Sequence, residues 1–410
     1  MNQLTCPDCD LIVEFAPLRA KQRAFCPRCG HLLTHRSFRA LERSTAFALA
    51  GLLFLVLANI YPFLSFSVSG QEQVMTLLQS SQELYRNGSK VLAFFVLAFI
   101  IVIPALIIFS LLLVLIPIIL KRRPVIGQQL WARFIFTLGP WSMVEVFILG
   151  VLASLTKIAS MATIVLGLSF WAYVAFTLCF LISLSALDRY QFWRTILPQQ
   201  STPAIAGKSA ASQGLSNCHI CTLTSTNTQH HCPRCGAILH TRIPNSLQRT
   251  VSLLITAMVL YLPANFLPIT HTDQFGNVLD STIMGGVILM WEHGSYPVAL
   301  IIFIASIMIP TAKLCALTWL SWSVSRQNSQ NSKQRTSVYR ITEFVGRWSM
   351  VDVFVVAILV ALIQLGGILT IRPGPAALAF SGVVIITMLA AEAFDPRLIW
   401  DKLEENKRDQ

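Results

Sequence analysis

The amino-acid sequence predicts an all-α polytopic membrane protein made of two parallel repeats of four transmembrane helices, each preceded by a small cysteine-containing module. Low charge, long apolar blocks and an internal repeat predict this fold. Of the 410 residues, 54% are hydrophobic and only 12% are charged, whereas soluble proteins carry about 25% charge. Apolar blocks such as 91–120 and 161–187 exceed the roughly 20 residues that cross a bilayer.

The repeat is visible without gaps. Residues 26–30 (CPRCG) recur at 232–236, an offset of 206 residues, and 139–147 (GPWSMVEVF) match 346–354 (GRWSMVDVF) at an offset of 207. Self-similarity on this scale predicts two halves of one architecture. Because each half contains an even number of spans, the halves have the same orientation and are related by an axis near the membrane normal.

Each half is expected to contain a cysteine module, a first span, an outer loop, two spans joined by a basic loop, and a fourth span. The spans are expected at 45–66, 91–120, 141–158, 161–187, 250–269, 297–324, 348–371 and 375–394. The outer loops, 67–90 and 270–296, contain helix-compatible pieces at 74–84 and 283–291. These pieces are expected to lie on the outer leaflet or to meet a partner.

These features divide the chain into six parts. The predicted parts are a first cysteine module (1–40), a first transmembrane repeat (41–198), a polar linker (199–217), a second cysteine module (218–242), a second transmembrane repeat (243–400) and a tail (401–410).

Positive charge alternates along the chain. Of the 31 Lys and Arg residues, 26 lie before residue 47 or in 121–140, 188–250, 323–347 and 395–410. These segments are the two ends and alternate loops, so the positive-inside rule predicts that both termini and both cysteine modules are cytosolic. The polar start carries no signal peptide. Since topology accounts for the net charge of +12, no nucleic-acid partner is expected.

The cysteines form two quartets. Two Cys-x2-Cys pairs are separated by sixteen residues in the first module and by ten in the second. Two intervening residues let one tight turn direct two thiolates at one ion, so the spacing predicts two zinc ribbons, with two zinc ions per chain. The eight predicted ligands are Cys6, Cys9, Cys26, Cys29, Cys218, Cys221, Cys232 and Cys235.

Other interpretations of the quartets are weaker. Tetrahedral thiolate sites also accept iron, a reducing cytosol disfavours disulfides, and a redox role needs a thioredoxin-like setting. A DNA-binding ribbon conflicts with tethering beside a membrane. The ribbons can be purely structural, or they can be regulatory or dock a partner; the sequence leaves this choice open.

Catalytic signatures are absent from the sequence. It contains no P-loop, Gly-rich dinucleotide turn, metalloprotease helix motif or serine-nucleophile elbow. The chain is therefore not expected to be an enzyme.

Ionisable residues within spans are the best functional candidates, because each is costly in a bilayer unless it is paired or faces water. Lys313 lies roughly 13 Å inside the sixth span, and its repeat counterpart is Ile107. Asp352, one turn inside the seventh span, is near enough for Lys313 to reach it by snorkelling. Ser306 and Thr387 lie at similar depths, so the four residues are predicted to form a polar cluster. A structural ion pair or a snorkelling lysine is the alternative.

Glu145 occupies the repeat position of Asp352. It is a candidate for the same polar network. Capping, or pairing with a basic neighbour such as Arg133 at the cytosolic surface, is the favoured alternative for Glu145.

The combined motifs resemble those of the paraquat-inducible protein A family. The motifs are the paired Cys-Pro-x-Cys ribbons, the Gly-x-Trp-Ser-Met-hydrophobic-acid motif at 346–352, the Asn-x-x-Pro end of each first span, and the stretch that holds Ser306, Pro310 and Lys313. The resemblance covers essentially the whole chain. It implies a protein of the bacterial inner (cytoplasmic) membrane that works with periplasmic MCE-domain proteins, which form tunnels across the periplasm. It also implies that Lys313, Asp352, Ser306 and Thr387 form a polar network.

Two hypotheses follow. The resemblance implies a component of a lipid transport system that loads membrane lipids into such a tunnel or receives them from it. The alternative is a non-transporting membrane scaffold or sensor whose zinc ribbons recruit a cytosolic partner. Lys313 discriminates between them, because a scaffold has no need for a lysine deep in the bilayer.

Overall fold

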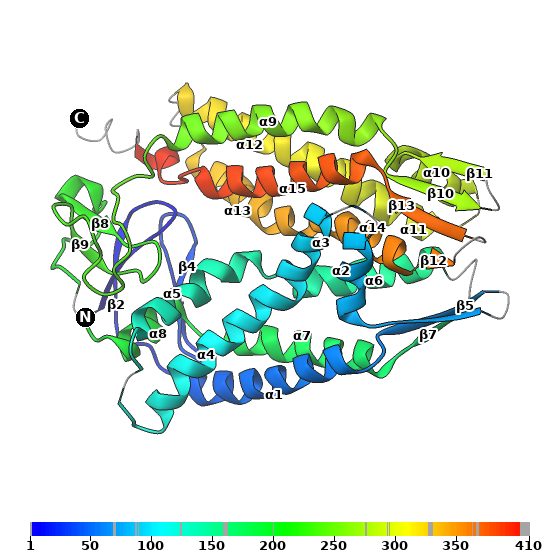
Figure 1. Cartoon of the computed structure of the whole chain (residues 1–410). Helices are drawn as coiled ribbons and strands as arrows, with labels where there is room; N and C mark the ends of the chain where they lie inside the picture. The colour runs from blue at the N-terminus through cyan, green and yellow to red at the C-terminus, as the bar shows by residue number, and fades with distance from the viewer. Residues whose placement is uncertain are drawn as a thin grey trace.

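The computed structural model describes residues 2–401 apart from 69–70, 87, 89, 124, 159–162, 200, 275–276, 293, 295, 327–330, 363 and 366–368. It is mostly helical. The helices of the two halves lie side by side, the cysteine modules lie at one end of the helical body, and short antiparallel sheets lie at the other (Figure 1). The architecture therefore places the two modules together, far from the outer loops.

Each cysteine module is built from short strands around Cys-x2-Cys turns. In the first module, β1 pairs with β2 and β3 pairs with β4, both antiparallel. In the second module, β8 pairs with β9. The strands are β1 (Asn2–Thr5), β2 (Ile12–Phe15), β3 (Arg23–Phe25), β4 (Leu32–His35), β8 (Leu215–Asn217) and β9 (Thr224–Thr226).

The first half has a helix at each of the four places where a span is predicted, and a 3-10 turn, η2, separates α5 from α6. The predicted helical piece of its outer loop is α2. Its helices are α1 (Ala40–Ile60), α2 (Leu77–Arg86), α3 (Lys90–Leu97), η1 (Ala98–Val102), α4 (Ile103–Ile119), α5 (Gln128–Leu138), η2 (Gly139–Trp141), α6 (Val144–Ile158), α7 (Leu168–Ala186) and α8 (Arg189–Ile196). A short turn, η3 (Ala211–Gln213), lies between the halves.

The second half repeats this order. The predicted helical piece of its outer loop is α10. Its helices are α9 (Ser246–Phe266), α10 (Ile283–Glu292), α11 (Tyr296–Phe303), η4 (Ile304–Met308), α12 (Ile309–Ser325), α13 (Ser332–Gly346), η5 (Arg347–Met350), α14 (Val351–Leu362) and α15 (Pro375–Ala393).

Seven helices in the described part of the chain are long and apolar enough to cross a membrane. They are Ala40–Ile60, Lys90–Ile119, Gln128–Leu155, Leu168–Ala186, Ser246–Phe266, Ala299–Ser325 and Pro375–Asp401. The span predicted at 348–371 corresponds to α14, whose 12 residues are too short for this criterion. Because residues 369–371 lie in a strand, the predicted end of that span is wrong. The arrangement of four spans in each half stays a prediction.

The all-α prediction misses the strands at the outer ends of the helices, so the predicted end of the span at 45–66 and the predicted start of the span at 161–187 are also wrong. One antiparallel sheet has the order β6-β5-β7 and the other the order β11-β10-β13-β12. In each sheet, a hairpin that follows the first span pairs with a strand that precedes the fourth span. The strands are β5 (Leu64–Val68), β6 (Gln71–Met75), β7 (Thr163–Leu166), β10 (Thr270–Gln274), β11 (Asn277–Ser281), β12 (Gln364–Leu365) and β13 (Leu369–Pro373). Each sheet closes its half at the end opposite the cysteine modules (Figure 1).

The first and fourth spans of each half pack against each other. In the first half, the hydroxyl of Ser183 in α7 donates to the carbonyl oxygen of Ser44 in α1 at 2.9 Å. In the second half, the hydroxyl of Ser246 in α9 donates to the carbonyl oxygen of Ala393 at 2.7 Å. Small hydroxyl residues allow this close approach and satisfy polar groups where no water is present.

The two halves meet through α6 and α14 at the centre of the body. Phe147 of α6 and Phe354 of α14 occupy the same repeat position. Their ring centroids are 5.7 Å apart in an edge-to-face arrangement, a geometry that aromatic rings favour. A contact between equivalent residues indicates that the axis relating the halves passes between these helices.

Each second span contains a π-helical segment at the same repeat position, η1 and η4. Pro104 and Pro310 follow these segments, and proline cannot donate the backbone hydrogen bond of a regular helix. A π-segment absorbs this defect and leaves backbone carbonyls poorly bonded. The phenolic hydroxyl groups of Tyr173 and Tyr261 donate to carbonyl oxygens in these segments, at 3.3 and 3.4 Å.

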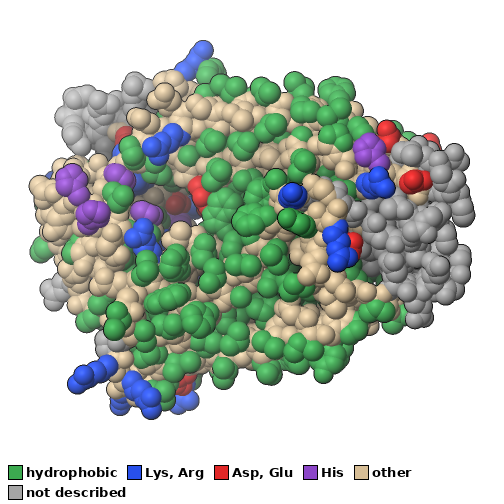
Figure 2. Space-filling view, in the orientation of Figure 1, with side chains coloured by type: hydrophobic (Ala, Val, Ile, Leu, Met, Phe, Trp, Pro, Cys, Tyr) green, Lys and Arg blue, Asp and Glu red, His purple; other side chains and the backbone are tan. Residues whose placement is uncertain are grey.

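Apolar side chains cover much of the helical surface in Figure 2, whereas most Lys, Arg, His and acidic side chains gather toward the two ends. Exposed large hydrophobic residues occur along α1, α4, α9 and α12. A bilayer, with a hydrocarbon core of about 30 Å, covers such a belt. The chain is therefore a membrane protein.

Candidate metal centres and a buried lysine cavity

Two buried quartets of cysteine sulfurs form candidate metal centres. In each quartet, the four Sγ atoms lie within 4.8 Å of one another, and the closest pairs are 3.3 to 3.5 Å apart. A tetrahedral zinc ion with Zn–S bonds of about 2.3 Å separates its sulfurs by about 3.8 Å. The residues therefore fit a four-coordinate metal, and all eight predicted ligands belong to the two quartets. None of these cysteines forms a disulfide.

The backbone conformation of the four Cys-x2-Cys turns explains why the sequence folds this way locally. The residue after the second cysteine of each turn has positive φ: Asp10, Gly30, Thr222 and Gly236. Its N–H donates to the carbonyl oxygen of the first cysteine, for example from Gly30 to Cys26 at 2.9 Å. Glycine adopts this conformation without steric cost.

An arginine from the second half reaches the first metal centre. Arg340 of α13 donates from Nη2 to Cys29 Sγ at 3.2 Å and from Nε to Asp8 Oδ2 at 2.6 Å. Asp8 also lies 3.0 Å from His31 Nδ1. Burial alone would raise the pKa of the Asp8 carboxyl, but His31 and Arg340 outweigh burial and hold that pKa below its ordinary value. A positive charge beside a thiolate stabilises the deprotonated form that binds a metal.

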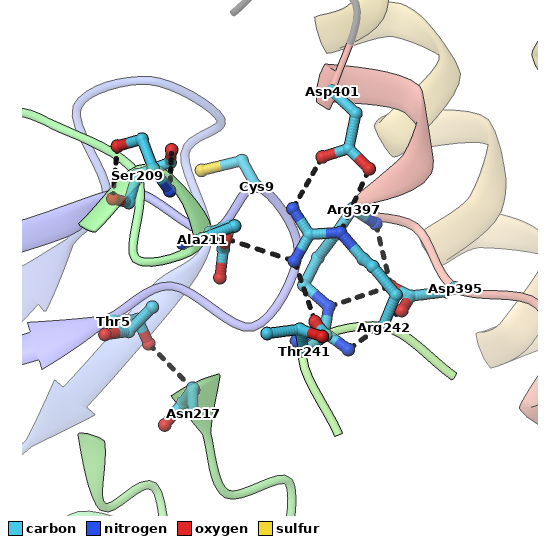
Figure 3. A network of polar contacts seen from close by, with 12 residues as sticks. Thr5, Cys9, Ser209, Ala211, Asn217, Thr241, Arg242, Asp395, Arg397 and Asp401 are labelled. Atoms are coloured by element: carbon cyan, nitrogen blue, oxygen red, sulfur yellow. Dashed lines mark hydrogen bonds and ion pairs between the residues drawn. The ribbon is translucent and has the colours of Figure 1, made fainter. Parts of the chain in front are cut away.

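The two ribbons and the end of the second half are joined by polar contacts (Figure 3). Arg242 pairs with Asp10 of the first ribbon at 3.1 Å and with Asp401 at 2.5 Å. Asn217 of the second ribbon donates from Nδ2 to the carbonyl oxygen of Thr5 at 3.2 Å. Burial disfavours the charge of Arg242, but its carboxylate partners outweigh burial and raise the pKa of the guanidinium above its ordinary value. The ribbons are therefore held as one unit.

The segment predicted as a linker contributes to this unit. The N–H of Ile12 donates to the carbonyl oxygen of Lys208 at 3.0 Å, and the N–H of Gly207 donates back to Ile12 at 2.9 Å. The N–H of Ala211 donates to Asp10 Oδ2 at 3.0 Å. These contacts extend the β1–β2 side of the first ribbon, so much of the segment is ordered against it.

Lys313 of α12 is buried, with 4% of its surface exposed. Within the described part of the chain, its Nζ atom has no hydrogen-bond partner. The side chain lies across Gly346 at the end of α13, where an added Cβ would come 2.7 Å from Lys313 Nζ. Any other residue at position 346 therefore conflicts with the observed position of the lysine.

A cavity of about 360 Å³ opens beside Lys313. Three basic and two acidic side chains line it, together with apolar ones. The lining residues are Pro140, Lys313, Arg340, Glu343, Phe344, Arg347, Met388, Ala391 and Glu392. Burial, and then the charge of Asp8, raise the pKa of the Glu343 carboxyl, although Arg347 opposes the shift. The cavity thus combines three cationic and two acidic groups with an apolar wall.

Ser306 and Thr387 form hydrogen bonds within their own helices. Ser306, in η4, donates to the carbonyl oxygen of Ile302 at 2.7 Å, and Thr387 donates to that of Val384 at 2.9 Å. Asp352 and Glu145 lie in the first turns of α14 and α6. The side chain of Asp352 is outside the described part of the chain. The four-residue network and the role of Glu145 stay predictions.

Comparison with known proteins places the chain in a family. The model of the family "Paraquat-inducible protein A" matches residues 41–196 and 247–404, which overlap the two predicted transmembrane repeats. The chain belongs to the paraquat-inducible protein A family. No solved structure matches it.

Relatives of the paraquat-inducible protein A family match over the whole chain. The sequence is 41% identical to the intermembrane transport protein PqiA of Escherichia coli strain K12, over 100% of this chain and 98% of the relative. It is 30% identical to the lipophilic envelope-spanning tunnel protein A of the same strain, over 97% and 91%. A probable intermembrane transport protein of Haemophilus influenzae is 28% identical, over 98% and 97%.

In this member of the paraquat-inducible protein A family, sequence reasoning missed the residues of α13. Arg340, Glu343 and Gly346 connect the first metal centre with the Lys313 cavity. The only sequence signal was the place of Gly346 at the start of the Gly-x-Trp-Ser-Met motif. The basic and acidic residues of α13 resemble those of any charged loop, so their spacing alone could not reveal the cavity.

Proposed function

We propose that the protein is the inner-membrane component of a lipid transport system. It works with a periplasm-spanning MCE-domain protein to move membrane lipids between the inner and outer membranes and so maintains envelope integrity. The names of its relatives, an intermembrane transport protein and an envelope-spanning tunnel protein, support transport between membranes. The chain acts as a transporter component and not as an enzyme.

The observation that carries this proposal is Lys313 in its cavity. A buried lysine in a membrane-spanning helix is costly unless it is paired, and the first half accommodates Ile107 at the same repeat position. A cationic group next to a partly apolar cavity is suited to the phosphate of a lipid headgroup. In the proposal, Lys313, Arg340 and Arg347 attract the headgroup, while Phe344 and Met388 contact its apolar part.

The ribbons support this site from the side of the basic loops. We propose that each cysteine quartet holds one zinc ion, which supplies a structural cross-link for a module too small to fold on its own core. Arg340 contacts Cys29 and also lines the Lys313 cavity. The first ribbon therefore positions α13, and α13 positions one wall of the cavity.

The alternative is a scaffold or sensor whose zinc ribbons recruit a cytosolic partner. The tight docking of the two ribbons into one unit favours it, because such a unit presents a defined surface. In this alternative, the charge of Lys313 has no role in transport.

Replacing Lys313 with isoleucine tests the proposal. A charged residue deep in a bilayer costs about 3 kcal/mol, so Lys313→Ile should insert and accumulate normally. If the lysine binds a headgroup, the variant should fail to complement a strain that lacks this protein and its paralogues. Mass spectrometry of the lipids that co-purify should show less bound phospholipid.

The matched control is Ile107→Leu, an apolar change at the equivalent position of the first half, which should complement fully. Full complementation by Lys313→Ile at normal protein level would contradict the transport role of the lysine and favour the scaffold.

A further inference from the structure

A second cavity lies where the first ribbon joins the membrane domain. It has a volume of about 680 Å³ and is lined by residues of β3, β4 and the start of α1. Five basic residues line it, and Glu42 is the single acidic one. The basic residues are Lys21, Arg23, Arg36, Arg39 and Arg43.

Most of this positive charge is not neutralised within the described part of the chain. Arg39 pairs with Glu42 at 3.7 Å, but both side chains are well exposed, at 69% and 62%, so the pair is weak. Arg36 donates to the carbonyl oxygen of Leu18 at 3.0 Å. Lys21, Arg23 and Arg43 form no ion pair with a carboxylate of the described residues. Several unneutralised cations around one cavity favour binding of an anion.

The repeat shows that the fold itself does not require this cavity. In the second half, the positions of Arg39 and Glu42 are held by Asn245 and Gln248. The counterpart of Arg36 is Arg242, which is engaged by Asp10 and Asp401.

Lys21 and Arg23 also lack basic counterparts. At the offset of 206 residues they correspond to Asn227 and Gln229. Only Arg36 and Arg43 have basic counterparts, Arg242 and Arg249, so the cluster of five cations is a feature of the first half alone.

The position of the cavity relative to the bilayer indicates its ligand. Helix α1 has 21 residues and is therefore about 31 Å long, close to the thickness of the hydrocarbon core. Its first turn carries Glu42 and Arg43, and its apolar run begins after Thr45, so the cavity beside this first turn is expected in the headgroup layer. Phe38, with 67% of its surface exposed, is placed to insert at this interface.

We propose that this cavity binds the phosphate of an anionic phospholipid from the leaflet next to the ribbons. Basic pockets at the membrane surface recognise such headgroups. The site is separate from the Lys313 cavity, and the proposal does not depend on lipid transport. Free inorganic phosphate shares the same chemistry, so the test must distinguish a lipid from a soluble anion.

The test uses the full-length protein in vesicles of phosphatidylcholine with a minority of phosphatidylglycerol. A phosphatidylglycerol probe with a photoreactive group near its headgroup is cross-linked to the protein, and the labelled peptides are identified by mass spectrometry. The variant K21Q/R23Q/R43Q removes three of the four cations that lack a carboxylate partner and keeps Arg36, which donates to the carbonyl oxygen of Leu18. We expect its labelling at residues 18–43 to fall at least about tenfold, because each cation near a membrane surface strengthens anion binding several-fold.

The matched control is K121Q/R122Q/R123Q, which removes the same charge from the exposed segment after α4. It should leave labelling at residues 18–43 within about twofold of the original protein. Unlabelled phosphatidylglycerol should compete with the probe, and inorganic phosphate should not.

Three results would overturn the proposal. The first is unchanged labelling of the cavity variant. The second is an equal loss of labelling in the control variant, which would indicate that diffuse surface charge binds the probe. The third is displacement of the probe by inorganic phosphate. Equal thermal unfolding midpoints of the two variants show that both are folded.

Discussion

At the scale of single residues, the depth of a polar side chain in the membrane could be predicted from the sequence. The side of the helix toward which that side chain points could not. The sequence places Lys313, Ser306 and Thr387 at similar depths, and all three are buried. Depth follows from counting residues along a helix, whereas contact depends on rotation about the helix axis. Ser306 and Thr387 use their hydroxyl groups on their own helices, a local bond that is common for these residues.

The contact between Lys313 and Gly346 gives a prediction at this scale. In Gly346→Ala, the new Cβ would come 2.7 Å from Lys313 Nζ and 2.9 Å from Cε. The flexible end of the lysine must then move, which costs about 0.5–1.5 kcal/mol if the side chain is forced off its rotamer. We expect a lower thermal unfolding midpoint for Gly346→Ala in detergent.

The repeat provides the matched control. Gly139 has helical backbone angles, and a Cβ built there has no atom within 4 Å. Gly139→Ala should therefore change the midpoint little, because the usual gain of alanine in a helix is offset by Pro140, which disfavours helical angles at the residue before it. In a Lys313→Ala background, Gly346→Ala should behave like Gly139→Ala. A lower midpoint that persists in that background would show that the lysine is not the cause.

At the scale of elements, local patterns were predictive and long-range pairings were not. Each Cys-x2-Cys turn is closed by backbone bonds between residues at most five apart, such as Cys26 to His31, so its sequence specifies it. The outer sheets depend on pairing β5 with β7 and β10 with β13, which are far apart in the chain. The hydrophobic residues of β7 resemble the start of a membrane span. For this reason the helix predicted at 161–187 includes β7.

The ribbons give a prediction of metal content. If each quartet holds zinc, purified protein should contain two zinc ions per chain by elemental analysis. Cys29→Ser should reduce this to one, because three thiolates lose much of the affinity of four. The control, Cys315→Ser, changes an exposed cysteine outside the quartets and should leave two. Iron in place of zinc, or one ion in the original protein, would show that a ribbon was misinterpreted.

At the scale of the whole molecule, the halves share a fold but differ at their candidate sites. Phe147 and Phe354 occupy equivalent positions and contact each other at the interface between the halves. Lys313 of the second half, in contrast, corresponds to an apolar residue, Ile107, in the first half. Arg340 ties α13 of the second half to the first ribbon, and Arg189 of the first half donates to the carbonyl oxygen of His219 in the second ribbon at 2.9 Å. Each ribbon thus contacts the opposite half, which couples the paired ribbons to both halves of the helical body.

The last prediction concerns orientation. Charge asymmetry predicts that the ribbon end is cytosolic, and the structure gathers the ribbons, α8 and α13 at that end. Cysteines introduced at Val74 and Asp280, which are exposed near the outer sheets, should react with a membrane-impermeant maleimide on intact spheroplasts. Cysteines at Arg122 and Lys208, exposed on the ribbon side, should react only after permeabilisation.

The background for this labelling replaces Cys179 and Cys315 with serine, because the other eight cysteines are buried in the quartets. Each variant must complement as well as the original protein, so that labelling reports the working orientation. Reaction at Lys208 on intact spheroplasts would reverse the topology and place the ribbons in an oxidising compartment, where disulfides compete with metal binding. Reaction at Asp280 but not at Val74 would contradict the parallel repeat, because both halves must direct their outer sheets to the same side.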